Sequence, residues 1–173
     1  RPTSHVVFGV AMAILAGDAL QTLGAYLLAT EPAGAKWTAR RNRALREVLF
    51  ALGSEGMAGG QALDLLQPAK KLPATRDELV KIHTLKTGRF LEASLLAGAS
   101  WAVADAAKRR ALALYGRSVG LAFQIVDDIL DVTRSPEELG KTPGKDATQD
   151  KATFPGLLGL DASRREAERL LSD

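Results

Sequence analysis

The chain has 173 residues, enough for one domain with a buried core, and its 46% apolar and 25% charged residues are ordinary for a globular protein. It contains no cysteine, which excludes disulfide scaffolds, zinc–thiolate sites and thiol nucleophiles. The net charge of +3 is too small to indicate binding to nucleic acid, and we expect none.

Every predicted element is a helix, because no segment of useful length alternates apolar and polar residues. Pro2 and Thr3 open the first predicted helix, which runs through Ala29. Its stretch 6–29 is nearly free of charge, but Asp18 in the middle would cost roughly 2.5–3.5 kcal/mol in a bilayer. We therefore predict a buried core helix there and no membrane span.

Capping signals and helical periodicity place the later helices. A helix is predicted over 38–52, and another over 61–66 after a run of glycines. Thr75 followed by Glu78 makes a capping box that opens a long helix. The last predicted helices cover 103–115 and 117–133, with a final one opened by a Ser163–Glu166 capping box.

The most informative residues are the aspartates of the predicted 117–133 helix. Asp127 and Asp131 are four residues apart and share one helix face, and Asp128 lies beside them. These carboxylates repel one another and no Lys or Arg lies within that helix turn, so we expect a cation to bridge them. Grouped carboxylates suit Mg²⁺, which binds one or two of them together with substrate phosphates. A solvent-facing acidic patch is the alternative.

Two basic segments could bind an anionic ligand. Lys86-Thr87-Gly88 lies inside the long helix, where a glycine costs about 1 kcal/mol relative to alanine and favours a kink beside Lys86. Lys141 and Lys151 lie in a segment punctuated by glycine and proline. A nucleotide-binding P-loop is excluded there, because Ser135 stands where its first glycine belongs and no strand precedes it. The segment fits a basic lid over a metal-bound diphosphate better, and surface lysines are the alternative.

The histidines and serines carry no catalytic pattern. His5 and His83 have no partner at the spacing of a metal site or a proton relay, so each is expected to be a structural histidine with a satisfied hydrogen bond. No serine has the context of a nucleophile elbow, so hydrolase chemistry has no support.

The stretch Phe123-Gln-Ile-Val-Asp-Asp-Ile-Leu-Asp131 resembles the second aspartate-rich motif of the trans-isoprenyl (polyprenyl) diphosphate synthase family. Further segments in that family's order are 17–20, 60–64, 86–88, 139–146 and 151–155. The resemblance is strongest to the short-chain farnesyl and geranylgeranyl diphosphate synthases. It implies an all-α antiparallel helical bundle of the isoprenoid synthase type, N-terminally truncated, with residues 1–173 as a single domain.

The resemblance also implies roles for individual residues. Asp127 would bind Mg²⁺ directly, Asp128 and Asp131 would complete the acidic face, and Asp146 would support metal-bound water. The residues expected to bind substrate are Gln61, Asp64, Lys86, Thr87, Gln124, Lys141 and Lys151. Among these, Lys86, Thr87 and Lys141 are expected to act in catalysis at the allylic diphosphate, and Lys151 to lie in the lid.

The implied reaction is the Mg²⁺-dependent head-to-tail condensation of isopentenyl diphosphate with an allylic diphosphate, giving farnesyl or geranylgeranyl diphosphate. The family's first aspartate-rich motif is absent, and residues 1–5 resemble the sequence that follows it. We therefore expect a C-terminal part that is inactive alone, belonging to a homodimeric enzyme in the cytoplasm, or in a plastid if the source is eukaryotic. The alternatives are a non-catalytic partner subunit and a terpene cyclase-like lyase; the Lys86 and Lys141 segments favour the transferase.

Overall fold

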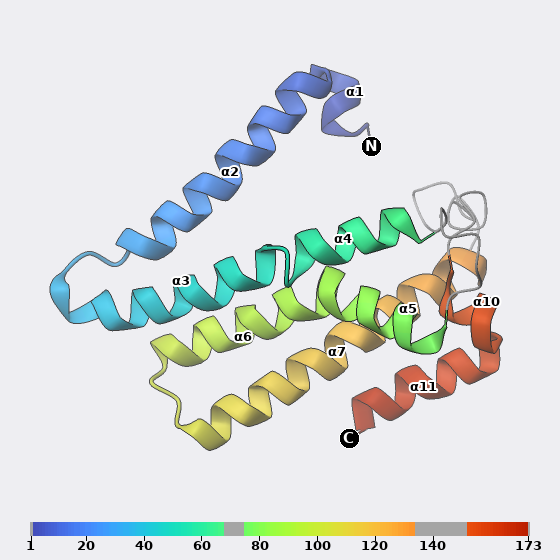
Figure 1. Cartoon of the computed structure of the whole chain (residues 1–173). Helices are drawn as coiled ribbons and strands as arrows, with labels where there is room; N and C mark the ends of the chain where they lie inside the picture. The colour runs from blue at the N-terminus through green and yellow to red at the C-terminus, as the bar shows by residue number, and fades with distance from the viewer. Residues whose placement is uncertain (1, 68–74, 134–151, 173) are drawn as a thin grey trace.

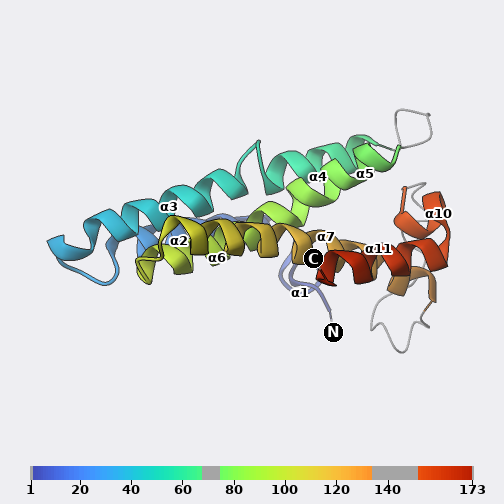
Figure 2. The same cartoon turned by 90° about the horizontal axis from the view of Figure 1, so that it is seen from below.

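The computed structural model describes residues 2–67, 75–133 and 152–172, and the elements assigned in these ranges are helices (Figures 1 and 2). The first are α1 (Ser4–Phe8), α2 (Val10–Thr30), the short 3₁₀ helix η1 (Ala35–Trp37), α3 (Thr38–Leu52) and α4 (Met57–Leu66). They are followed by α5 (Arg76–His83), the π-helix η3 (Thr84–Gly88), α6 (Arg89–Trp101), α7 (Ala106–Thr133), α10 (Phe154–Leu158) and α11 (Leu160–Ser172).

Helices α3, α6 and α7 form the centre of the bundle, with α6 packed against both of the others and α11 packed along α7 (Figure 1). Gly116 lies in the middle of α7, where an added Cβ would be only 2.7 Å from the Cα atom of Glu92 in α6. The predicted separate helices over 103–115 and 117–133 were therefore wrong. Gly116 allows α6 and α7 to pack closely. This packing keeps α7 continuous although glycine has a poor helix propensity.

Helix α2 differs most from expectation. The helix predicted from Pro2 through Ala29 is divided at Gly9, whose φ is +82°. The prediction of a buried core helix was also wrong, because no residue of α2 is buried and Leu20 is 68% exposed. In Figure 1 the C-terminal end of α2 lies beside the start of α3, and its N-terminal end lies away from the bundle. By length and composition alone it is the one helix in the described ranges that could cross a membrane.

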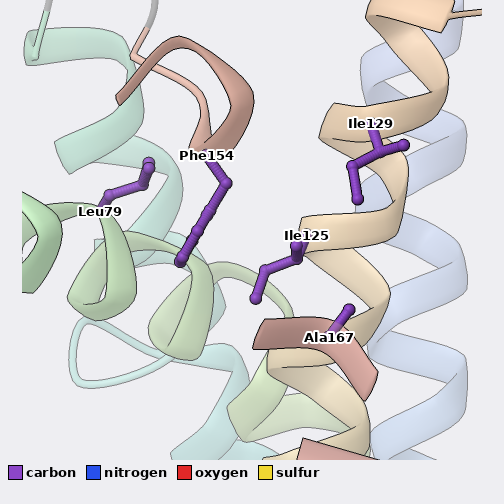
Figure 3. Close-up of a cluster of buried hydrophobic side chains, with 5 residues drawn as sticks. All are labelled: Leu79, Ile125, Ile129, Phe154 and Ala167. Carbon is purple, nitrogen blue, oxygen red and sulfur yellow. The ribbon is translucent and has the colours of Figure 1, made fainter. Parts of the chain in front are cut away.

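A hydrophobic cluster joins the C-terminal helices to the rest of the bundle (Figure 3). Its buried members are Leu79, Ile125, Ile129, Phe154 and Ala167. Phe154 and Ile125 are both 0% exposed, and full burial of a side chain of this size contributes about 1.5–3 kcal/mol. Because these residues come from α5, α7, α10 and α11, the cluster fixes the start of α10 against the helix that carries the aspartates.

The two predicted capping boxes have opposite outcomes. The first is confirmed, since Thr75 Oγ1 accepts a hydrogen bond from the Glu78 backbone N–H (3.2 Å) and Glu78 accepts one from the Thr75 N–H (3.0 Å). The second was wrong, because α11 begins before Ser163. The Ser163 hydroxyl lies inside the helix and donates to the carbonyl of Gly159 at 2.9 Å.

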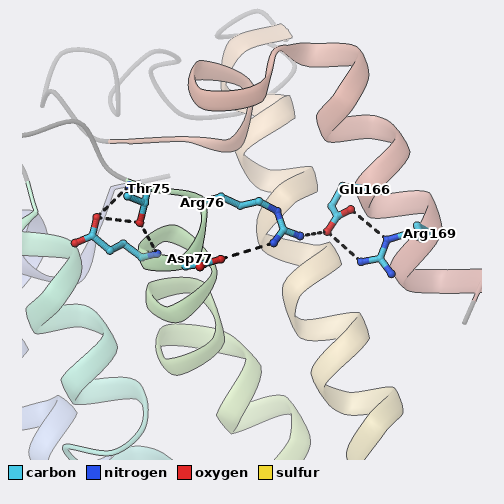
Figure 4. Close-up of polar contacts among 6 residues, drawn as sticks. Thr75, Arg76, Asp77, Glu166 and Arg169 are labelled. Carbon is cyan, nitrogen blue, oxygen red and sulfur yellow. Dashed lines mark hydrogen bonds and ion pairs between the residues drawn. The ribbon is translucent and has the colours of Figure 1, made fainter.

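Glu166 connects α11 to α5 instead of capping its own helix (Figure 4). Its carboxylate accepts from Arg76 Nη2 at 2.6 Å and from Arg169 Nη2 at 3.1 Å. The hydrogen bond from Arg169, and then that from Arg76, hold the pKa of Glu166 below its ordinary value against the opposing effect of burial. The ion pair between Arg76 and Glu166 is thus a pH-sensitive contact between α5 and α11.

Candidate functional site

The predicted kink beside Lys86 is a π-helical turn, η3, inserted between α5 and α6. A π-turn carries one more residue than a turn of α-helix, and such turns are frequent at functional sites. The long helix expected from Thr75 is therefore confirmed. The π-helical turn includes Lys86-Thr87-Gly88, the segment where the sequence predicts a kink.

Two glycines allow neighbouring helices to approach this turn closely. Gly60 of α4 faces the backbone of Lys86, and an added Cβ would overlap the Lys86 amide nitrogen. Gly120 of α7 faces Gly88, with an added Cβ only 2.5 Å from the Gly88 Cα atom. Helices α4 and α7 therefore both contact η3, so that predicted site residues from three segments lie on adjoining elements.

Lys86 and Asp64 form an ion pair across the contact between η3 and α4. Lys86 Nζ lies 2.9 Å from Asp64 Oδ2, and the two side chains are 32% and 16% exposed. Gln61, one turn earlier on α4, is exposed, and Thr87 is half-buried. The structure therefore brings together Asp64 and Lys86, two of the predicted substrate-binding residues.

The aspartates of α7 have different environments. Asp127 is exposed, whereas Asp128 and Asp131 are 7% and 4% exposed, and Gln124 is buried at 9%. Among the residues that the structure describes, no group of three or more metal-ligating side chains is close enough to hold an ion. Asp127, Asp128 and Asp131 therefore do not form a three-carboxylate metal site within the described residues, and their roles in binding metal stay predictions.

Asp128 is held by two other elements. Its Oδ2 atom lies 3.2 Å from Nε2 of His83 in α5 and accepts the backbone N–H of Phe154 in α10 at 2.9 Å. The His83 ring stacks on the Phe154 ring with centroids 5.6 Å apart. His83 is thus the structural histidine that the sequence predicts. The contact with Asp128 was not predicted, because the two residues are 45 positions apart and nothing local connects them.

The residue types on α7 nevertheless fit Mg²⁺ shared with a phosphate ligand. Asp127 and Asp131 offer carboxylate oxygens, and Mg²⁺ is usually bound by one or two carboxylates together with substrate phosphates. Two carboxylates suit a Mg²⁺ ion that is also bound by a phosphate ligand better than one bound by protein side chains alone. Lys141, Asp146 and Lys151 lie outside the described residues, so the lid and the indirect metal contact stay predictions.

Comparison with known sequences gives a consistent result. The sequence profile described as polyprenyl synthetase matches residues 1–173. Over 174 residues the chain is 44% identical to a protein named geranylgeranyl pyrophosphate synthase 7, chloroplastic, from Arabidopsis thaliana, covering 100% of this chain and 50% of that protein. Over 171 residues it is 42% identical to a dimethylallyltranstransferase of Fischerella ambigua, covering 99% of this chain and 49% of that protein.

Solved structures share the arrangement of helices. An FPP/GFPP synthase from Zymomonas mobilis matches with a TM-score of 0.84 at 35% identity, covering 99% of this chain and 55% of that one. A geranyltransferase from Helicobacter pylori, complexed with magnesium and isoprenyl diphosphate, matches with a TM-score of 0.78 at 31% identity, covering 98% of this chain and 54% of that one. The chain therefore spans about half the length of each of these relatives.

Proposed function

This chain belongs to the polyprenyl synthetase family, and from that premise we propose that it is part of a Mg²⁺-dependent trans-prenyltransferase. The proposed reaction is head-to-tail condensation of isopentenyl diphosphate with an allylic diphosphate, giving farnesyl or geranylgeranyl diphosphate. The observation that carries the proposal is the close packing of the Lys86 turn against both α4 and the aspartate-bearing α7. That packing supports one diphosphate site built from all three elements.

In this proposal Lys86 is the principal cationic contact to the allylic diphosphate from η3. The ion pair with Asp64 keeps its ammonium group beside α4 before substrate binds. Its positive charge then stabilises the negative charge that builds on the departing diphosphate. The Thr87 hydroxyl and the Gln124 amide supply hydrogen bonds to the same group, and Gln61 lines the pocket from α4.

Asp127 and Asp131 would hold the magnesium. Bound there, Mg²⁺ would neutralise charge on the leaving diphosphate and so ease cleavage of the allylic C–O bond. Apolar side chains of the surrounding helices would keep water from the carbon that becomes cationic. Lys141, Lys151 and Asp146 are proposed to complete the site from outside the described residues.

The remaining parts of the proposal concern the complete enzyme. The groups that bind isopentenyl diphosphate and the first aspartate-rich motif are expected outside this chain, because the chain spans only half of its relatives. A homodimer is proposed for the full-length protein. A cytoplasmic location is proposed, or a plastid location for a eukaryotic source, which the relatives named chloroplastic support.

A prenyltransfer assay tests the proposal. The protein encoded by the complete gene, given Mg²⁺, isopentenyl diphosphate and dimethylallyl diphosphate, should release farnesyl or geranylgeranyl diphosphate, whereas the 173-residue chain alone should release none. Lys86→Ala should lower kcat about 100-fold or more, because an electrostatic contact to the developing charge is lost. Lys81→Ala, at an exposed lysine of α5, is the matched control and should retain activity. A complete protein that folds but releases no product would favour the non-catalytic subunit.

A further inference from the structure

We propose that His83 is a positioning residue for the diphosphate site: through Asp128 it fixes α7 relative to the turn that carries Lys86. The inference deepens the proposed function and rests on it, because Lys86 and the α7 aspartates are the groups that would share the diphosphate. It also gives Asp128 a role different from that of a magnesium ligand.

The contact is buried and has defined donors. The Phe154 N–H donates to Oδ2 of Asp128, and the imidazole tautomer with its hydrogen on Nε2 lets His83 donate to the same oxygen. The side chains of His83 and Asp128 are 7% and 9% exposed, which shields these bonds from water. With two hydrogen bonds on Oδ2, Asp128 is poorly suited to bind Mg²⁺ through that oxygen.

His83 and Asp128 lie next to the proposed diphosphate-binding residues and so can orient the segments that carry them. His83 lies one helical turn before Lys86, and Asp128 directly follows Asp127. The same two segments also meet where Gly120 faces Gly88, so α7 and the α5–η3 segment touch at two points in antiparallel order. The glycine contact sets how closely the backbones approach. A directional hydrogen bond at the second point sets how far one helix slides or rotates against the other.

The two nitrogens of the imidazole are not equivalent in this contact. Nδ1 of His83 is buried and has no hydrogen-bond partner among the described residues, so Nε2 alone makes the polar contact. The amide nitrogen of glutamine reaches the position of Nε2, whereas that of asparagine reaches only the position of Nδ1. A phenylalanine would keep the ring stacked on Phe154 and remove the donor.

Three substitutions at His83 therefore form the test. Calorimetry of the 173-residue chain with inorganic pyrophosphate and Mg²⁺ should give a Kd for His83→Gln close to that of the parent. His83→Asn and His83→Phe should weaken binding by about 10–100-fold, because losing an outer contact that orients a metal site usually has an effect of this size. Circular dichroism establishes the folded fraction, by which each Kd is corrected. Parental affinity in His83→Phe overturns the inference, and so does equal weakening by all three substitutions.

Hydrogen exchange at the Phe154 amide gives a readout that needs no ligand. Exchange should be slow in the parent and in His83→Gln, and at least about tenfold faster in His83→Phe, because Asp128 loses the partner that holds it. His5→Phe, at an exposed histidine, is the matched control and should change neither readout. If the parent binds no pyrophosphate with Mg²⁺, this chain does not form the proposed diphosphate site by itself. Unchanged exchange in His83→Phe then overturns the positioning role independently.

Discussion

Gly120 of α7 lies so close to Gly88 at the end of the π-helix that a Cβ atom there would be 2.5 Å from the Gly88 Cα atom. The obstacle is backbone, which cannot move aside as the end of a flexible side chain can. The spacing between the aspartate-bearing helix and the Lys86 turn therefore depends on glycine at this position.

Gly120→Ala should destabilise the protein, although alanine favours helix intrinsically. Overpacking of this kind costs about 1–3 kcal/mol in the free energy of unfolding, measured by urea denaturation. Gly98→Ala in α6 is the matched control, because nothing lies within 4 Å of an added Cβ there. It should instead stabilise the protein by about 0.5–1 kcal/mol. Equal effects of the two substitutions would contradict the contact.

Phe154→Ala should be more damaging than either glycine substitution. Phe154 is fully buried between α5 and α7, and removing a buried phenylalanine ring costs about 3–5 kcal/mol. Denaturant unfolding followed by circular dichroism measures the loss. Phe123→Ala, at an exposed phenylalanine of α7 (58% exposed), should cost much less, and a similar loss at both positions would count against the cluster.

The ion pair of Glu166 should make stability depend on pH. Because the folded-state pKa of Glu166 is lowered, its contribution is present above the unfolded pKa of about 4.3 and is lost as the pH falls through the lower folded value. Glu166→Gln should remove this component, so that the difference in unfolding free energy from the parent shrinks below about pH 4. Glu168→Gln, at an exposed glutamate of the same helix, is the control. A difference that stays constant down to pH 2 would refute the prediction.

The exposed apolar side chains of α2 should make the isolated chain associate. Leu15 and Leu20 are 59% and 68% exposed on a helix with no buried residue, and apolar surface of this extent favours association in water. Multi-angle light scattering should report species larger than a monomer. A Leu15→Lys, Leu20→Lys double variant should shift the distribution toward monomer. A monodisperse monomer of the parent chain would disagree with this expectation.

The sequence correctly predicted the features that depend only on residues close together in the chain. The Thr75 capping box and the irregular turn at Lys86-Thr87-Gly88 follow from chemistry within a few positions, and both were found. Gly116 and Ser163 were misinterpreted because their roles come from tertiary packing. Gly116 admits the backbone of α6, and Ser163 bonds inside a helix that starts earlier than its own capping pattern suggests.

In the candidate site, too, features that follow from nearby residues were predicted, whereas contacts that depend on tertiary packing were not. Helical spacing identified the aspartates and the resemblance identified Lys86, but neither could place Asp128 against His83, because that depends on how α5 lies along α7. The exposure of α2 was missed because an apolar sequence does not specify which surface covers it. The single domain over 1–173 and the roles of Lys141, Asp146 and Lys151 stay predictions.

The π-turn at Thr84–Gly88 amounts to one additional residue within an otherwise regular rod. Each residue of an α-helix advances the side-chain direction by about 100°. The wide turn absorbs the advance of its extra residue, so deleting one residue there would restore a regular helix and keep the direction of the α6 side chains, but would remove the irregular turn beside Lys86. The length of this short segment therefore determines whether the backbone beside Lys86 departs from regular helix.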